Sequence, residues 1–110
     1  MARIVRGGLI QCSLAESTEK PIEVIKKAMI DKHVALIEEA GKKGVQILCL
    51  QELFYGPYFC AEQKTKWYAM VERIPEGQTI KLMQQYAKKL QMVIVVPIYE
   101  EEITGVYYNA

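Results

Sequence analysis

A carboxylate stands directly after a short apolar run in the stretch ILCLQELFYGPYFC, which covers residues 47–60. The run has the length and composition of a buried strand, and the carboxylate is Glu52. In open α/β sheets, ligands bind outside the carboxyl ends of the strands, so Glu52 would stand where a catalytic group is expected. A carboxylate in such a place can act as a general base or a general acid.

Aromatic side chains crowd the residues after Glu52 and surround a Gly-Pro pair; they are Phe54, Tyr55, Tyr58 and Phe59. The Gly-Pro pair is typical of a loop, and rings on such a loop are well placed to line a pocket. They would disfavour the charged form of Glu52 by excluding water from it. Two alternatives stay open: Glu52 is a solvated or turn-capping loop acid, and the rings are ordinary core or interface residues.

Cysteine and histidine add little to this chemistry. Cys12 and Cys49 lie inside apolar runs, where a thiol behaves as a small hydrophobe, and three cysteines without a CxxC pair do not indicate a disulfide scaffold. Cys60 lies in the aromatic loop, but no histidine is evidently placed to activate it as a nucleophile. The single histidine, His33, falls on the apolar face of a predicted helix and is expected to be a packed residue. No Cys or His spacing predicts a metal site.

The glycine-containing stretches do not predict a phosphate or dinucleotide site. The segment GKKG at 41–44 lacks both the spacing and the Ser or Thr of a phosphate-binding loop. The pair at 7–8 is not a dinucleotide fingerprint. Taken residue by residue, the chain offers one good acid and no catalytic partner for it.

The elements that would position Glu52 follow from the spacing of the apolar residues. Residues 4–12 are predicted to form a first strand and residues 45–51 a second one. Between them, Pro21 is placed as the first residue of a long amphipathic helix, and Gly41 or Gly44 is expected to end it. The apolar face of this helix recurs at steps of three and four: Ile22, Ile25, Met29, His33, Leu36 and Ala40.

The second half of the chain predicts further elements of the same kinds. Residues 61–71 carry a weak helical pattern, residues 79–90 a clear amphipathic helix, and residues 92–99 a β-branched strand. Because Pro97 cannot donate a ladder hydrogen bond, that end of the strand must lie at an edge, a bulge or the exit of the strand. A turn at residues 100–105 is expected to lead into a return strand.

This order of elements predicts an α/β fold. Strands that are apolar throughout and separated by helices indicate a mostly parallel inner sheet with helices packed on it. The final residues, YYNA, stop within the last predicted strand without a cap or a polar tail. We therefore expect residues 1–110 to form the N-terminal portion of a single, larger domain.

Composition and charge exclude several classes of function. The chain is 51% hydrophobic and 25% charged, as in an ordinary globular domain, and its lysines are dispersed around a net charge of +1. Nucleic acid and anionic membranes are therefore not expected partners. No apolar run approaches the roughly 20 residues of a membrane span, and the N-terminal run is too short for a signal peptide. A reducing, cytoplasmic location is predicted.

The sequence resembles the nitrilase superfamily of carbon–nitrogen hydrolases. The resemblance rests on ILCLQELFYGPYFC, on RIVRGGLIQC near the N-terminus, on AGKKGVQ after the predicted helix, and on MVIVVPIYEEE followed by GVYYN. It runs along the whole chain, and it is strongest to the branch of β-ureidopropionase and N-carbamoylputrescine amidohydrolase. It implies an α-β-β-α sandwich that assembles into homo-oligomers.

The resemblance also implies roles for single residues. Members of the superfamily use a glutamate, a lysine and a cysteine, and the position of the glutamate falls on Glu52, which would act as general base. Tyr55 and Tyr58 would border the substrate pocket. The lysine and the cysteine would lie beyond Ala110, and Cys60 belongs to the loop motif instead. This chain alone is therefore expected to be inactive, and no metal or organic cofactor is expected.

The implied reaction is hydrolysis of a non-peptide carbon–nitrogen bond in a small-molecule substrate. That substrate would be an N-carbamoyl compound such as N-carbamoyl-β-alanine or an N-carbamoyl amine. Two alternatives stay open. One is an ω-amidase or nitrilase of the same superfamily, and the other is a truncated, catalytically inactive binding or assembly module.

Overall fold

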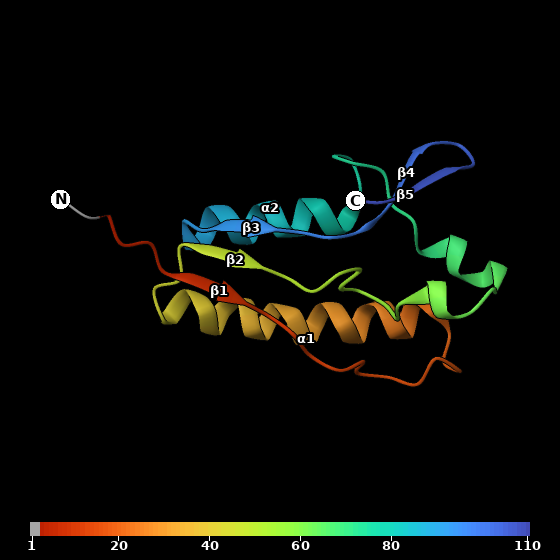
Figure 1. Ribbon diagram of the computed structural model, residues 1–110, viewed down its shortest axis with the longest axis horizontal. Helices are drawn as coiled ribbons and strands as arrows, with labels where there is room; N and C mark the ends of the chain where they lie inside the picture. Colours follow the sequence, from red (N-terminus) through yellow and green to blue (C-terminus); the bar gives the residue numbers. More distant parts are fainter. Residues whose placement is uncertain (1–2) are drawn as a thin grey trace.

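The computed structural model describes residues 3–110 and contains a small sheet of parallel strands. Its strands are β1 (Gly7–Leu9), β2 (Ile47–Cys49) and β3 (Val93–Val95), in the order β1-β2-β3 (Figure 1). Both neighbouring pairs run parallel. The predicted parallel inner sheet is therefore confirmed.

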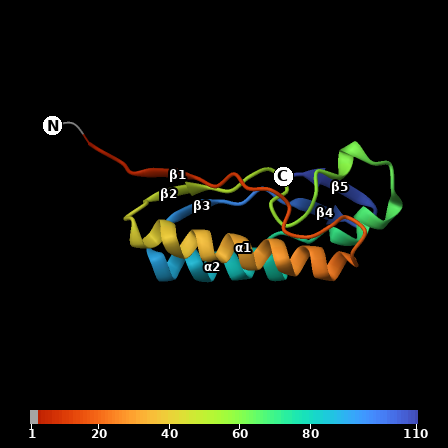
Figure 2. The same ribbon diagram turned by 90° about the horizontal axis from the view of Figure 1, so that it is seen from below.

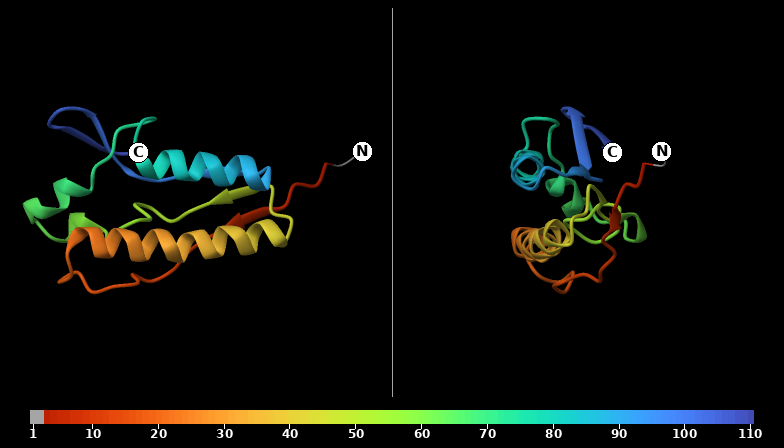
Figure 3. Two further views of the ribbon diagram at one scale, coloured as in Figure 1. Left: turned by 180° about the vertical axis from the view of Figure 1, so that it is seen from behind. Right: turned by 90° about the vertical axis from the view of Figure 1, so that its left-hand side faces the viewer.

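Two helices cover one face of this sheet. They are α1 (Ile22–Lys42) and α2 (Gln78–Leu90), and they lie side by side beneath the strands (Figure 2). The end-on view in Figure 3 places both helices on the same side of the strands. No helix among residues 3–110 combines the length and the apolar character needed to span a bilayer.

The strand register places alternate residues on opposite faces of the sheet. Gly8, Leu48 and Ile94 lie opposite one another on the helix-covered face, and Leu48 is buried. The neighbouring positions face away from the helices, and there Leu9 is 85% exposed and Val93 is 60% exposed. One face of the sheet is thus packed, and the other presents apolar side chains to solvent.

The first strand is shorter than the predicted 4–12 because of this register. Gly7 pairs with Ile47, the first residue of β2, so the residues before Gly7 extend past the sheet. The carbonyl of Arg6 still accepts the backbone N–H of Gln46 at 2.8 Å. The N–H of Arg6 donates to the side-chain Oε1 of Gln46 at 2.9 Å, so the regular backbone ladder stops there.

The first helix begins after Pro21, whose φ of −55° suits the entry into a helix. Gly44, with φ of +73°, turns the chain out of the helix toward β2. Gly41 lies inside the helix, so of the two predicted stops Gly44 is the one used. A Cβ atom at Gly41 would lie 3.0 Å from Leu90, the last residue of α2, so glycine here lets the two helices pack closely.

The far end of the molecule consists of two short 3₁₀ helices and a hairpin (Figure 1). The 3₁₀ helices are η1 (Phe59–Ala61) and η2 (Thr65–Met70), where the sequence predicted a weak helix over residues 61–71. The hairpin consists of the antiparallel strands β4 (Tyr99–Ile103) and β5 (Val106–Asn109).

The predicted turn at residues 100–105 is wrong for residues 100–103, which belong to β4. The turn is confined to the residues between the two strands, where Gly105 has φ of +81°. The acidic run EEE lacks the apolar alternation of a strand, but its backbone is paired on both sides. On one side, the backbone N–H of Glu101 donates to the carbonyl of Glu72 at 2.9 Å. On the other side, Glu101 is paired with Tyr107 of β5.

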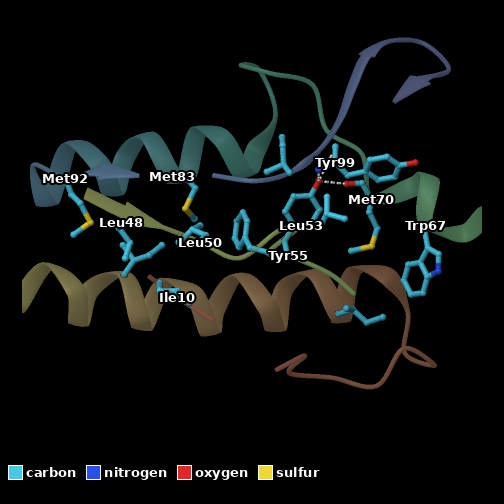
Figure 4. Close-up of a cluster of buried hydrophobic side chains, with 14 residues drawn as sticks. Ile10, Leu48, Leu50, Leu53, Tyr55, Trp67, Met70, Met83, Met92 and Tyr99 are labelled. Atoms are coloured by element: carbon cyan, nitrogen blue, oxygen red, sulfur yellow. Dashed lines mark hydrogen bonds between the residues drawn. The ribbon is translucent and has the colours of Figure 1, made fainter. Parts of the chain in front are cut away.

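The core fills the space between the helices and the sheet and continues toward the hairpin (Figure 4). Its buried apolar residues are Ile10, Ile25, Ile37, Leu48, Leu50, Leu53, Phe54, Tyr55, Trp67, Met70, Met83, Met92, Ile98 and Tyr99. His33 is also fully buried, as predicted, with Nδ1 2.8 Å from the carbonyl oxygen of Met29. Burial lowers the pKa of His33, so this side chain is a neutral part of the core.

Candidate active site

Glu52 lies just beyond the carboxyl end of β2, at the edge where the parallel strands end. Two hydrogen bonds fix the backbone immediately before it. The N–H of Leu50 donates to the carbonyl of Val95 at 3.1 Å, and Oε1 of Gln51 accepts the N–H of Cys12 at 2.7 Å. The segments that leave all three strands therefore meet beside Glu52, as in the ligand sites of other open α/β sheets.

A sharp turn follows Glu52 and is centred on Leu53. Leu53 has φ of +50°, a left-handed conformation that is uncommon for a residue other than glycine, and its side chain is buried. The carbonyl of Leu53 accepts the N–H of Gly56 at 3.2 Å, and the N–H of Phe54 donates to the carbonyl of Pro97 at 3.4 Å. Such unfavourable backbone conformations persist where surrounding structure holds them, often at functional sites.

Phe54 and Tyr55, the first two of the four rings after Glu52, do not cover it, contrary to the prediction. Phe54 and Tyr55 are 0% and 2% exposed and lie in the core, whereas Glu52 is exposed. Phe54 packs edge-on against His33, with ring centroids 4.9 Å apart. Because the turn at Leu53 sends these two rings inward, the expected desolvation of Glu52 by them is wrong.

Asn109, at the end of β5, contacts Glu52 directly. Its Nδ2 donates to Oε1 of the carboxylate at 2.5 Å, across 57 positions of the sequence. The sequence gives no signal for this contact beyond the position of the asparagine at the end of a predicted return strand. The structure thus brings one polar partner to the candidate acid that the residue pattern did not reveal.

Tyr58 and Cys60 lie near Glu52 on the exposed side of the loop. Tyr58 is 56% exposed, and Cys60 is exposed as well. The neighbouring Cys60 thiol, and to a lesser degree the Glu52 carboxylate, raise the pKa of Tyr58. A contact between Tyr58 and substrate is compatible with this position and stays a prediction.

A cavity of about 460 Å³ opens between η1, η2 and β4, with Cys60 on its wall. Most of its apolar lining is aromatic: Phe59, Trp67, Tyr68 and Tyr99. The chain's single histidine, His33, has its Nε2 3.8 Å from Sγ of Cys12 and is not placed to activate Cys60. Among residues 3–110, no three His, Cys, Asp or Glu side chains gather as metal ligands would.

Tyr55 has a structural position in this chain. Its buried hydroxyl donates to the carbonyl of Met70 at 2.8 Å and lies 3.2 Å from the carbonyl oxygen of Tyr99. Burial, followed by the charge of Glu72, raises the pKa of Tyr55, so the hydroxyl stays protonated and can donate. The predicted contact of Tyr55 with substrate stays a prediction, and the position of its hydroxyl does not support it.

Comparison with known proteins gives the family of the chain. The family model of carbon-nitrogen hydrolases matches residues 10–110. A β-ureidopropionase of Arabidopsis thaliana is 41% identical over 101 residues, which cover 92% of this chain and 24% of that protein. An N-carbamoylputrescine amidase of Oryza sativa subsp. japonica is 36% identical over 86 residues, which cover 78% of this chain and 28% of that protein.

The fold comparison agrees with the sequence comparison. The crystal structure of a carbon-nitrogen hydrolase from Helicobacter pylori G27 superimposes with a TM-score of 0.79 and 26% sequence identity, over 96% of this chain and 33% of that one. The chain spans about a quarter of the length of the curated relatives described above. By family model, sequence identity and fold, the chain belongs to the carbon–nitrogen hydrolase family.

Proposed function

We propose that this chain forms the N-terminal portion of a single carbon–nitrogen hydrolase domain that hydrolyses N-carbamoyl compounds, with Glu52 as general base. The observation that carries the proposal is the placement of Glu52: an exposed carboxylate at the carboxyl end of β2, fixed by Asn109. Supporting it is the 41% identity to a protein named β-ureidopropionase. The substrate class follows from that relative and from the N-carbamoylputrescine amidase.

The proposed reaction needs a thiol and a cation in addition to Glu52. A cysteine attacks the carbamoyl carbon while Glu52 accepts the thiol proton, and a lysine stabilises the oxyanion of the tetrahedral intermediate. The intermediate collapses, and the leaving amine takes the proton back from Glu52. Water then attacks the resulting thiocarbamate and gives a proton to Glu52, and the departing thiolate takes this proton back. The carbamic acid that is released breaks down to carbon dioxide and the second amine. We assign the lysine and the cysteine to the remainder of the domain.

The uncovered face of the sheet supports an incomplete domain. Leu9, Val93 and Val95 are 85%, 60% and 48% exposed on the face that the helices do not cover. A contiguous apolar face of this kind is normally buried against another layer. In the proposed α-β-β-α sandwich, a second sheet from the remainder of the domain packs there, and homo-oligomers form from the completed domain.

The exposure of Glu52 has the same explanation in this proposal. A general base works best in a site from which bulk water is excluded, and the first 110 residues supply only one wall of such a site. The exposed Tyr58 stands on that wall near Glu52, and the exposed Cys60 lies next to Tyr58. The remaining walls would come with the lysine and the cysteine.

A substrate panel on the complete domain tests the proposal. Release of ammonia would be measured from N-carbamoyl-β-alanine, from N-carbamoylputrescine and from an ω-amide of a dicarboxylic acid. We expect the highest kcat/KM for an N-carbamoyl compound. Preference for the ω-amide would reassign the protein to the amidases of its family, and absence of turnover for all three would favour a binding or assembly module.

Tyr55 and Tyr58 form a matched pair for testing the predicted substrate contacts. We expect Tyr55→Phe to lower the free energy of unfolding of the complete domain by about 1–2 kcal/mol, because the carbonyl of Met70 loses its donor and the N–H of Tyr99 loses its acceptor. Its kcat/KM should stay near the wild-type value. Tyr58→Phe should leave stability within about 0.5 kcal/mol, since the side chain is exposed. Chemical denaturation and steady-state assays measure both effects, and a Tyr55→Phe variant of full stability but weak activity would restore Tyr55 as a substrate contact.

A further inference from the structure

The contact between Asn109 and Glu52 points to a role that goes beyond the proposed function and rests on it. We propose that Asn109 is a positioning residue, which orients the Glu52 carboxylate for proton transfer by holding one of its two oxygens. Three features of the molecule carry this inference: the geometry of the contact, the rigidity of the segment that presents Asn109, and the absence of charge on the amide.

The contact has a defined donor and acceptor. Nδ2 of Asn109 lies 2.5 Å from Oε1 of Glu52. A reversed amide would place two oxygens against each other, so the amide can only donate here. Because it holds Oε1, the second carboxylate oxygen remains available to accept a proton from an attacking thiol or water.

The segment that presents Asn109 is clamped to the exit of β3. Ala110 and Ile98 exchange two backbone hydrogen bonds, of 2.7 and 2.9 Å, and Asn109 stands opposite Tyr99 in the hairpin register. Ile98 and Tyr99 are both buried. The hairpin therefore presents the amide to Glu52 from a fixed position.

The third feature is that Asn109 is a neutral hydrogen-bond donor, whose contact with Glu52 does not depend on the charge of neighbouring groups. The Tyr58 hydroxyl is a titratable group near the carboxylate, and the Cys60 thiol lies next to that hydroxyl. An amide does not titrate in the working pH range, so the contact with Glu52 stays the same while neighbouring groups gain or lose protons. A lysine in this position would compete with the catalytic lysine, and an acid would compete with Glu52 for its proton.

Enzyme kinetics on the complete domain test the inference. We expect Asn109→Ala to lower kcat by about 10- to 100-fold with little change in KM, because a hydrogen bond to a charged group is lost without loss of a substrate contact. We expect Asn109→Asp to move the acidic limb of the pH–rate profile upward by about one pH unit or more, because two adjacent carboxylates cannot both ionise readily. The matched control is Gln85→Glu, which adds the same charge at an exposed position of α2 and should leave the profile unchanged.

Three outcomes would overturn the inference. They are an Asn109→Ala variant with wild-type kcat, an Asn109→Asp profile that superimposes on the wild-type profile, and a loss that falls entirely on KM. The last would make Asn109 a substrate contact. Circular dichroism and thermal melting establish that the variants are folded.

A spectroscopic arm separates this inference from the proposed function. In ¹⁵N-labelled protein, the side-chain amide protons of Asn109 should shift as Glu52 titrates, and Glu52→Gln should abolish that shift. This measurement needs no turnover. If the wild-type domain hydrolyses none of the panel substrates but the amide still reports on Glu52, the contact stands and the proposed function fails. If the amide is insensitive to Glu52→Gln, the positioning role fails whatever the activity.

Discussion

Replacing Glu52 with glutamine in the complete domain is expected to lower kcat/KM by about 10³-fold, while the fold stays intact. Glutamine has the shape of glutamate, and its carbonyl oxygen can still accept the hydrogen bond from Asn109. It cannot accept a proton from the thiol, however, so both chemical steps of the proposed reaction lose their base. The exposed position of Glu52 means that the substitution leaves no buried group without a partner.

The measurement is ammonia release under single-turnover and steady-state conditions. Glu102→Gln is the matched control, because Glu102 is an exposed acid on β4 and should keep wild-type kinetics when neutralised. Retention of near wild-type turnover by Glu52→Gln would remove Glu52 from the mechanism. It would also reassign the contact with Asn109 to the structural support of the loop.

The helix and the parallel strands that position Glu52 were predictable from the sequence, because they depend on local patterns of apolar residues. Ile25, Met29 and His33 of the predicted apolar face are buried on the sheet side of α1. The next buried residue is Ile37, where the spacing had predicted Leu36, which is half-buried. The β-branched run around Val93 to Val95 predicted a strand, and it pairs parallel to β2. Since parallel strands end at one edge, the position of Glu52 at that edge also followed from the sequence.

The immediate surroundings of Glu52 were not predictable, because they depend on contacts far apart in the chain. Asn109 is 57 residues from Glu52, and the backbone contact that fixes Phe54 comes from Pro97. The left-handed conformation of Leu53 also goes against the preference of leucine, and tertiary contacts impose it. The inward direction of the two rings after Leu53 depends on that turn, which is why the predicted aromatic cover over Glu52 was wrong.

A second acid, Glu72, escaped notice in the sequence and forms the main polar contact between the helices and the hairpin. Its carboxylate lies 2.6 Å from Nζ of Lys26 on α1, and it accepts hydrogen bonds from the backbone N–H of Thr79, at 2.8 Å, and from its hydroxyl. Its backbone pairs with β4 through Tyr99 and Glu101. Thr79 lies in the first turn of α2, so Glu72 also supplies the anionic cap that this helix otherwise lacks.

Loss of Glu72 is therefore expected to have the largest effect on stability among the substitutions considered. Glu72→Ala should lower the free energy of unfolding of the complete domain by about 2–4 kcal/mol, because it leaves a half-buried lysine without its partner and uncaps α2. Glu76→Ala is the control, since Glu76 is an exposed acid in the same turn, and it should change stability by less than about 0.5 kcal/mol. Urea denaturation followed by circular dichroism measures both values.

The pH dependence of stability distinguishes the charge of Glu72 from its packing. Burial alone would raise the pKa of Glu72, but the hydrogen bonds from Lys26 and Thr79, together with the charge of Lys26, outweigh burial and hold the pKa below its usual range. The stabilisation from the charge is therefore fully present above the unfolded-state value of about 4.3, and it is lost as the pH falls through the lower folded-state value. Wild type and Glu72→Gln should differ most at neutral pH and converge in acid. A difference that is constant from pH 7 to pH 3 would mean that shape and packing, and not the ion pair, account for the contribution of Glu72.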